Sequence, residues 1–366
     1  MINFILLTSV ALFNFISTAT ANLSNIVDVR TGSTNTCILK VDSLTCFGSN
    51  LYGESENIKG FNQAKQLALG ESHTCVLDQD GIWCWGRNNY GQTSVPAGLK
   101  NPKAVFARSQ QSCTIDDEGL KCWGKDRQGE TTVPTGIKNP KAVAIGDSHT
   151  CAIDDEGVKC WGAIGGEGRT TVPAGLKNPK AITTGYSHSC AIDDEGVKCW
   201  GDNRVGQTSV PTGLKNPTAV LAGAAHTCAI DDEGLKCWGD NRNGQISTQT
   251  GMKKPISISA GLTHTCAYNE EGVKCWGSNW NNQMTVPEGI KNPKAISSGS
   301  FHTCAIDDKG IKCWGNQTDS PLVVPEGIKN PKAVSSGGTH TCAIDDEGLK
   351  CWGDNRNGQT SVLNGL

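Results

Sequence analysis

Short apolar runs of four to six residues alternate with polar segments rich in Gly and Pro along almost the whole chain. In one representative stretch, three such runs occupy residues 142–146, 149–153 and 158–162, and the turn segments GDSH and DDEG lie at their junctions. A fourth short run, TTVP at 170–173, follows a polar loop. Runs of this length bounded by turn residues are typical of β-strands. The pattern therefore predicts an all-β chain with four short strands in each unit.

The units repeat with a period of 38 residues, which the cysteines mark most clearly. Eighteen cysteines form nine pairs, and the two members of each pair are nine positions apart. Successive pairs are offset by 38 residues, except that Cys190 follows Cys151 by 39. Nine repeats of four short strands are the pattern of β-propeller blades, so we expect an all-β propeller with nine blades. A solenoid is the alternative, although its repeats usually carry one long strand or a helix.

The spacing of the two cysteines in each repeat predicts a disulfide across a β-hairpin. If DDEG at 154–157 is the hairpin loop, Cys151 lies opposite Cys160 on the same face of the sheet. A non-hydrogen-bonded pair at this position brings the two Cα atoms to about 4.5 Å, which suits a disulfide. Zinc ligation is the competing interpretation, but a zinc site needs closely spaced pairs that converge. The predicted disulfides join Cys37 to Cys46, Cys75 to Cys84, Cys113 to Cys122, Cys151 to Cys160, Cys190 to Cys199, Cys228 to Cys237, Cys266 to Cys275, Cys304 to Cys313 and Cys342 to Cys351.

Composition and charge narrow the location and the partners. The chain has 366 residues and a formal net charge of −3, so it lacks the basic excess that nucleic-acid binding requires. Residues 1–21 are uncharged, mostly apolar and end in Ala-Thr-Ala, which predicts a secretory signal peptide and a mature propeller at 22–366. No Lys or Arg lies near Met1, so an N-terminal membrane anchor is the alternative. Together with the disulfides, the signal predicts a secreted, periplasmic or cell-surface protein.

The repeated motif G-x-x-H-x-x-A-I…G-V-K-x-W-G-x-N-x-x-G-Q resembles the regulator of chromosome condensation repeat family, and it covers essentially the whole mature chain. Within that family, the segment GQTSVPAGLKNPKAV at 91–105 is similar to the secreted bacterial beta-lactamase inhibitory propeller. This resemblance implies a β-propeller that binds a protein through its loops. The founding family member is a nuclear nucleotide-exchange factor, but that role depends on a protruding insertion that these uniform repeats lack.

The resemblance leaves the number of blades open, because propellers of this family usually have seven. We favour a single ring of nine blades. A seven-bladed ring with two appended units is one alternative. If the blade boundary is offset from the sequence repeat, residues 26–30 would instead complete the last blade.

No group of residues in the sequence suggests catalysis. Nucleophile elbows, phosphate-binding loops and HExxH motifs are absent from the sequence, so we expect no enzyme activity, no cofactor and no metal site. A histidine precedes the first cysteine by two positions in seven repeats, and Asn35 and Gln111 replace it in the other two. We expect these histidines to be buried and to bond backbone groups between blades. The DDE acids could attract calcium, but Asp and Gly also favour turns, and Lys138 and Lys141 lie on loops at the same end.

Because the repeats are nearly identical, the positions that differ between them are candidates for function. Differences cluster in the GDSH turn and in the loop after Cys-Trp-Gly, which strand alternation places at the same end of the blade. Aromatic residues and arginines are common there, as they are at protein-binding hot spots. The predicted partner-binding residues are Tyr52, Tyr90, Arg127, Tyr186, Arg204, Arg242, Leu262, Trp280, Phe301 and Arg356. We expect a monomer that binds a protein, and the alternative is a propeller that binds carbohydrate.

Overall fold

The computed structural model describes residues 26–31, 35–162, 166, 168–244, 246–247, 252, 255–261, 264–315, 323–356 and 360. The predicted signal peptide at 1–21 lies outside these residues. The described chain contains strands and turns and no helix. It divides into two compact units, of which one holds Ala68–Arg242 and the other combines residues 26–67 with residues 243–360.

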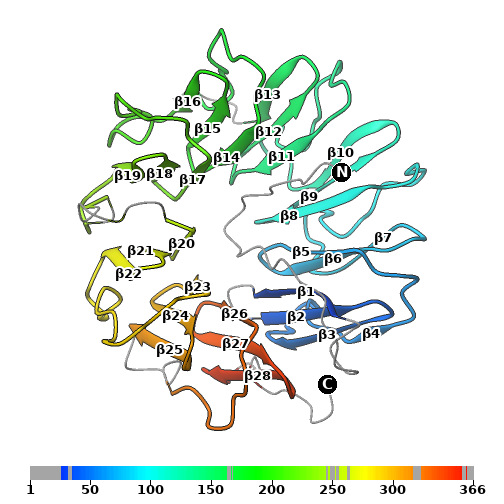
Figure 1. Ribbon diagram of the computed structural model, residues 1–366. Helices are drawn as coiled ribbons and strands as arrows, with labels where there is room; N and C mark the ends of the chain where they lie inside the picture. The colour runs from blue at the N-terminus through cyan, green and yellow to red at the C-terminus, as the bar shows by residue number, and fades with distance from the viewer. Residues whose placement is uncertain are drawn as a thin grey trace. The chain divides into compact units, whose positions relative to one another are not determined.

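Nine antiparallel sheets follow one another along the chain, and each corresponds to one sequence repeat (Figure 1). We refer to these sheets as blades one to nine. Their strands are β1 Ile26–Thr31, β2 Asn35–Lys40, β3 Ser43–Gly48 and β4 Ile58–Lys59; β5 Gln66–Leu69, β6 His73–Leu77 and β7 Ile82–Gly86; β8 Ala104–Arg108, β9 Gln111–Asp116 and β10 Gly119–Gly124; β11 Ala142–Ile145, β12 His149–Asp154 and β13 Gly157–Gly162; β14 Ala181–Thr184, β15 His188–Asp193 and β16 Gly196–Gly201; β17 Ala219–Ala222, β18 His226–Asp231 and β19 Gly234–Gly239; β20 Ser257–Ala260, β21 His264–Asn269 and β22 Gly272–Gly277; β23 Ala295–Ser298, β24 His302–Asp307 and β25 Gly310–Gly315; and β26 Ala333–Ser336, β27 His340–Asp345 and β28 Gly348–Gly353.

Within the described residues, eight of the nine blades have three strands, so the prediction of a fourth strand in every unit is wrong. In blade four, residues 170–173 form no strand, although TTVP has strand-like composition. Thr171 N donates to Gly168 O and Val172 N to Thr170 O, so this segment bonds to itself in turns rather than to a neighbouring strand. Val172 packs instead against the apolar residues between blades four and five.

The first blade is the exception, because β4 adds a fourth strand by pairing with β3. The suggestion that residues 26–30 complete the last blade is wrong, since β1 pairs with β2 of its own blade. β1 nevertheless lies beside β26 of blade nine within the same compact unit (Figure 1). The first and ninth blades are therefore neighbours through side-by-side packing and not through a shared sheet.

The hairpin register in every blade places the two cysteines directly opposite each other. In blade four Cys151 pairs with Cys160, and Asp154 pairs with Gly157 across a two-residue turn. All nine predicted disulfides are present, and their Cα atoms are 4.0–4.2 Å apart. This is the short separation of a non-hydrogen-bonded antiparallel pair. The described chain has no free cysteine.

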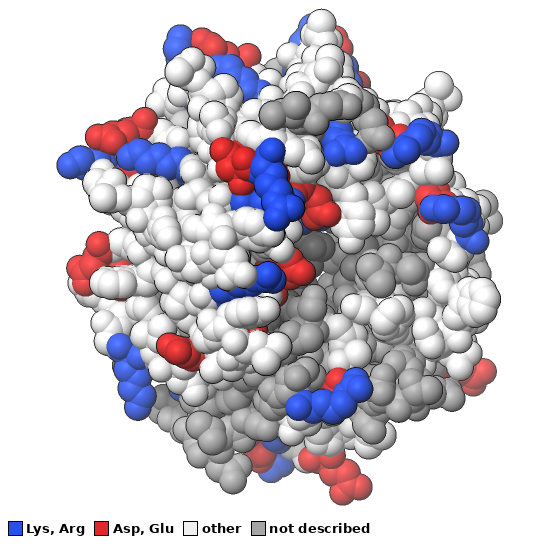
Figure 2. Space-filling view, turned by 180° about the vertical axis from the view of Figure 1, so that it is seen from behind, with Lys and Arg blue, Asp and Glu red and all other residues white. Residues whose placement is uncertain are grey.

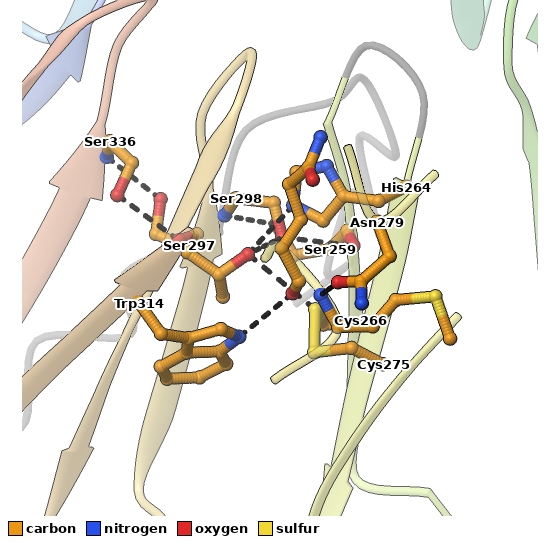
Figure 3. Close-up of a disulfide and its surroundings, with 12 residues drawn as sticks. Ser259, His264, Cys266, Cys275, Asn279, Ser297, Ser298, Trp314 and Ser336 are labelled. Atoms are coloured by element: carbon orange, nitrogen blue, oxygen red, sulfur yellow. Dashed lines mark hydrogen bonds between the residues drawn. A yellow bond between two sulfur atoms is a disulfide. The ribbon is translucent and has the colours of Figure 1, made fainter. Parts of the chain in front are cut away.

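The apolar core lies between consecutive blades. The face of blade four that carries Cys151 and Ile153 packs on Ala191 and Trp200 of blade five. The same arrangement joins blades seven and eight, where the face that carries the Cys266–Cys275 disulfide packs on Trp314 (Figure 3). Several of these tryptophans donate from the indole Nε1 to a backbone carbonyl in the loop that follows Cys-Trp-Gly of the preceding blade. Trp314 donates in this way to Gln283 O at 2.9 Å. Because Cys-Trp-Gly recurs in eight repeats, the sequence predicts that its tryptophan is a core residue between blades, and the structure confirms this prediction.

In blades two, four, five, seven and eight, a buried histidine bonds to a side-chain hydroxyl of the next blade. His149 Nε2 lies 2.8 Å from Ser189 Oγ of the next blade, and His188 Nε2 lies 2.9 Å from Thr227 Oγ1. The histidines are buried as expected, but the partner of Nε2 is a side-chain hydroxyl where the sequence suggested a backbone group. Burial lowers the pKa of His149 to about 3 and that of His188 to about 4, so both rings are neutral at pH 7.

Removing one disulfide is expected to destabilise the chain measurably. The double substitution Cys151→Ala/Cys160→Ala opens a loop of about ten residues and should lower the free energy of unfolding by about 2–3 kcal/mol. Urea unfolding at pH 7, with the other disulfides intact, measures this loss. The control Lys141→Ala removes an exposed ion pair to Asp155 in the turn of the same hairpin and should cost less than about 1 kcal/mol. Equal losses in the two variants would contradict the assigned role of the disulfide.

Stability is expected to fall as the pH falls from about 6.5 toward 4. Burial lowers the pKa of His73, His264 and His340 to about 4 and that of His302 to about 3. The unfolded chain therefore binds protons in this range that the folded chain does not, which favours unfolding. His149→Gln places in blade four the residue that blade three already has, and it should reduce the slope of stability against pH by about 1.4 kcal/mol per unit. Urea unfolding between pH 7 and pH 5 measures the slope, and an unchanged slope would count against this origin of acid sensitivity.

Candidate functional site

The variable segments of each blade meet at one end, as the sequence predicted. We call it the His end, and it consists of the turn between the first two strands and the loop after Cys-Trp-Gly, here the CWG loop. A backbone hydrogen bond joins the two segments, from Asp202 N to Ser187 O at 2.8 Å in blade five and from Asp240 N to Ala225 O at 2.9 Å in blade six. The opposite end, here the DDEG end, carries the hairpin turn and the Lys-Asn-Pro-Lys linker.

The backbone of the CWG loop is fixed by two side chains of the loop itself. In blade five Asn203 Oδ1 accepts from Thr208 N at 3.0 Å, and the buried Gln207 Oε1 accepts from Val205 N at 3.1 Å. Gly206 has a φ of 82°, which explains the glycine at this position. These bonds leave the two residues between Asn203 and Gly206 to point outward.

The same framework occurs in other blades whose displayed residues differ. The side chains that accept a backbone N–H at the position of Asn203 are those of Asn50, Asn88, Asp126, Asn279 and Asn355. The side chains that do so at the position of Gln207 are those of Glu54, Gln92, Glu130 and Gln283. The displayed pairs are Leu51 and Tyr52, Asn89 and Tyr90, Arg127 and Gln128, Arg204 and Val205, and Trp280 and Asn281. A constant backbone therefore carries variable side chains.

Large apolar side chains are exposed at the His end in both compact units. In the unit formed by residues 26–67 and 243–360, Trp280 is 89% exposed and Tyr52 is 46% exposed. In the unit Ala68–Arg242, Tyr186 is 48% exposed. Phe301 and Tyr90 are half-buried, and Leu262 lies outside the described residues. Exposed aromatic side chains of this kind are enriched at protein-binding surfaces.

One aromatic residue and one arginine contact each other across neighbouring blades. Arg127 Nη2 of blade three donates to Tyr90 Oη of blade two at 2.7 Å, and its Cζ lies 5.0 Å from the centroid of the tyrosine ring. The CWG loops of blades two and three therefore contact each other through these side chains.

The other arginines of the predicted site are held by aspartates of their own loops. Arg204 Nε and Nη2 donate to the Asp202 carboxylate at 2.8–3.1 Å, and these bonds lower the pKa of Asp202 to about 2. Arg242 with Asp240 and Arg356 with Asp354 repeat the arrangement. Asp202 is only 8% exposed, whereas the side chain of Arg204 is 74% exposed. The loop therefore conceals the acid and displays the guanidinium in a fixed orientation.

The DDEG end varies less than the His end, and most of its charges are paired within the blade or with the preceding linker. In blade four Lys159 Nζ contacts Asp154 and Glu156 at 2.8 and 2.9 Å, while Lys138 contacts Glu156 at 2.7 Å. Burial raises the pKa of Asp154, but the hydrogen bonds that it accepts outweigh this effect and lower the pKa below its usual value. The predicted charge balance by Lys138 and Lys141 is confirmed, since Lys141 pairs with Asp155 at 2.9 Å. On the face drawn in Figure 2, Lys and Arg atoms also lie beside Asp and Glu atoms.

Two exposed or half-buried residues escaped the sequence analysis. Trp83 on β7 occupies the position of Lys159 in its blade and is 50% exposed. Arg108 lies at the end of β8. In the blades that have the histidine, a glycine occupies this position, three residues before the histidine. Both could have been found by comparing every position of the repeats and not only the two variable segments.

The described residues contain no group of three or more His, Cys, Asp or Glu side chains that could hold a metal ion. No helix in this part of the chain is long and apolar enough to cross a membrane.

A family model, the Regulator of chromosome condensation (RCC1) repeat, matches seven stretches that together exceed half of the chain. These are residues 64–92, 141–168, 180–207, 218–245, 256–283, 294–320 and 332–359. The matches omit the first and third repeats, which are the two in which Asn35 and Gln111 replace the histidine. No curated protein sequence matches the chain significantly.

Several solved structures are similar to the chain at low identity. The ectodomain of the Physcomitrella patens receptor kinase CR4 is 23% identical, with 72% of this chain and 76% of that chain covered and a TM-score of 0.46. The CRINKLY WD40 ectodomain of the Arabidopsis thaliana receptor kinase ACR4 is 22% identical, with 79% and 97% covered and a TM-score of 0.45. Yeast RCC1 (Prp20), in its structure bound to Kap60, is 18% identical, with 94% and 95% covered and a TM-score of 0.49.

The Asp202–Arg204 ion pair predicts how the pKa of Asp202 changes when the arginine is removed. Replacing Arg204 with Met removes the hydrogen bonds that stabilise the ionised carboxylate, so the pKa of Asp202 should rise from about 2 by at least about one unit. Carbon-13 NMR titration of the side-chain carboxyl measures this change. Arg127→Met removes a guanidinium from another blade and should leave the Asp202 titration unchanged. An equal shift in both variants would mean that the pair does not act locally.

Proposed function

The chain belongs to the regulator of chromosome condensation (RCC1) repeat family, and from this premise we propose that it is a non-catalytic β-propeller that binds a protein partner through the His end of its blades. The observation that carries the proposal is the CWG loop, whose backbone is held constant while its two displayed residues vary. A fixed loop loses little conformational entropy on binding, and variable side chains on it determine which partner fits.

The displayed residues are of the kinds that contribute most to protein–protein affinity. Trp280, Tyr52 and Tyr186 provide exposed aromatic area, and Arg204 and Arg242 provide oriented guanidinium groups. Aromatic residues and arginine are enriched at the centres of protein interfaces. Because Asp202 and Asp240 already hold the arginines, these side chains have less freedom to lose when a partner binds.

The DDEG end is a poorer candidate for the same role. Its lysines and acids are paired with each other inside the blade, as Lys159 is with Asp154 and Glu156. A partner that bound these charges would have to separate them first, and exposed pairs of this kind add little to affinity.

The disulfides indicate that the protein works in an oxidising environment. Nine intrachain disulfides join all the cysteines of the chain, and the first cysteine of each pair is buried. We propose a secreted, periplasmic or cell-surface location and a partner that is met there. Inhibition of an extracellular or envelope enzyme is the specific form of binding that we propose, in keeping with the similarity to the beta-lactamase inhibitory propeller.

Affinity capture with the oxidised mature chain tests the proposal. Two variants probe the two compact units separately, Tyr90→Ala/Tyr186→Ala in one and Tyr52→Ala/Trp280→Ala in the other. We expect a captured protein to lose at least about tenfold in affinity for one or both variants, because hot-spot side chains contribute about 2 kcal/mol or more each.

Trp83→Ala is the matched control, since it removes an exposed aromatic side chain from β7 away from the His end. A partner that Trp83→Ala loses and both other variants retain would overturn the assignment to the His end. Release of the partner by simple sugars would favour the carbohydrate-binding alternative. Circular dichroism and thermal unfolding establish that each variant is folded.

A further inference from the structure

Blade three differs from its neighbours at three positions of one turn. Arg108 stands where the other blades of this unit have Gly70, Gly146, Gly185 and Gly223. Gln111 stands where they have histidine, and Ser109 between them has a left-handed φ of 49°. Non-glycine residues in this backbone region are strained, and such strain often marks a functional position.

The substitutions at 108 and 111 are physically linked. A Cβ atom at Gly146 would lie only 2.7 Å from Cε1 of the His149 ring. Blades that have the histidine therefore require glycine three positions before it. Gln111 removes the ring and still bonds to the next blade, because its Nε2 donates to Asp147 O at 3.4 Å. The histidine is thus replaced in a way that preserves the contact between blades and makes room for a long side chain.

Arg108 uses this room to reach past blade four. Its Nη1 donates to the backbone carbonyl of Thr184 in blade five at 3.0 Å, which is 76 positions away in the sequence. Within the described residues this is the only hydrogen bond of the guanidinium, and it forms no ion pair there. Arginine has five N–H donors, so a half-buried guanidinium with one partner retains most of its capacity to bind an anion.

A second unsatisfied polar group lies beside the acceptor of this bond. Thr184 is 2% exposed, and its Oγ1 has no hydrogen-bond partner in the described chain. Strand alternation places its side chain on the same face of β14 as Ile182, which packs against Ala144 and Ile153 of blade four. The hydroxyl therefore faces the side from which Arg108 approaches. A buried hydroxyl without a partner costs free energy unless a ligand or water completes it.

We propose that Arg108 and the Thr184 hydroxyl form an anchor site for a carboxylate side chain of the protein partner. The proposal rests on the proposed function and specifies its chemistry, an Asp or Glu that enters the His end between blades three and five. A carboxylate matches the planar donors of arginine, and it can also accept from a hydroxyl. Tyr186, exposed at the same turn of blade five, lies within electrostatic range of Arg108 and provides an aromatic edge for the rest of the partner residue.

Asp147 is the acidic group that opposes this binding. It is exposed at the turn of blade four and acts on Arg108 electrostatically without forming an ion pair with it. Other charged side chains at these turns are Glu71, which accepts a hydrogen bond from Gln110 at 3.2 Å, Lys125, whose Nζ donates to Asp147 O, and Arg169, whose Nη1 donates to Ser148 Oγ. Removing the Asp147 charge should therefore strengthen binding of a carboxylate.

Titration of small carboxylates against the arginine side-chain NMR signals tests the proposal without the partner. The probes are acetate, a blocked glutamate (N-acetyl-glutamate methylamide) and glucuronate, with chloride at equal ionic strength as the control. The comparison variant is Arg108→Gly/Gln111→His, which gives blade three the residues of the histidine blades. We expect saturable binding of acetate and blocked glutamate that weakens at least about tenfold in this variant and tightens a few-fold in Asp147→Asn.

The alternative role of Arg108 is a structural brace between blades three and five, and thermal unfolding separates the two. An anchor site predicts that Arg108→Gly/Gln111→His is at least as stable as the natural chain, because a half-buried cation is removed. A less stable variant that binds acetate as well as the natural chain would identify a brace and overturn the proposal. Shifts that do not saturate, or that chloride reproduces, would overturn it as well.

The titrations with blocked glutamate and with glucuronate distinguish a protein carboxylate from a glycan carboxylate. Glucuronate that binds tenfold more tightly than blocked glutamate would assign the site to an acidic glycan and overturn a protein anchor. These titrations do not depend on partner capture, so their failure leaves the proposed function standing. Conversely, capture that fails while the titrations succeed would reject the proposed partner binding and retain the site.

Discussion

Contact between the faces of consecutive blades is the constraint on which the rest of the structure depends. A sheet of three strands with at most six residues each cannot bury enough apolar area alone, so its two faces must be complementary to those of its neighbours. One face carries the disulfide and an isoleucine, as with Cys151 and Ile153, and the other carries a small residue and a tryptophan, as with Ala191 and Trp200. The histidine–hydroxyl bond then fixes how far one blade slides along the next. Residues at these positions have little freedom to change, which is why variation is concentrated at the loop positions that point outward.

The features that could be predicted from the sequence are those that recur in every repeat and depend only on local geometry. The hairpin register could be derived from the nine-residue cysteine spacing, because Cys151 and Cys160 can oppose each other in only one alignment of the DDEG turn. The burial of the tryptophans and the charge balance at the DDEG end were also predictable, since both result from strand alternation. The location of the variable segments at one end of the blade was predictable for the same reason.

The errors concern interactions between segments that a local pattern does not contain. Val172 belongs to a strand-like run, but its apolar side chain is used to fill the gap between two blades and its backbone turns. The hydroxyl partner of His149 lies 40 positions away in the next blade, so no local pattern indicates it. Arg108 was overlooked because it replaces a residue of the scaffold, and the reason for that glycine becomes visible only from its distance to the histidine ring. The framework of Asn203 and Gln207 was likewise not predicted, since Asn or Asp at the first position and Gln or Glu at the second suggest only a polar loop.

Every disulfide is confined to a single hairpin, as in the pair Cys151–Cys160, and none crosses from one blade to another. A segment of 38 residues therefore carries both of its cysteines with it when it is duplicated, deleted or exchanged by recombination. The number of cysteines stays even, and oxidative folding of the new unit needs no partner elsewhere in the chain. A gene of this design can lengthen or shorten by whole repeats without producing a mispaired thiol, and each new copy supplies another CWG loop in which mutation can explore new surfaces.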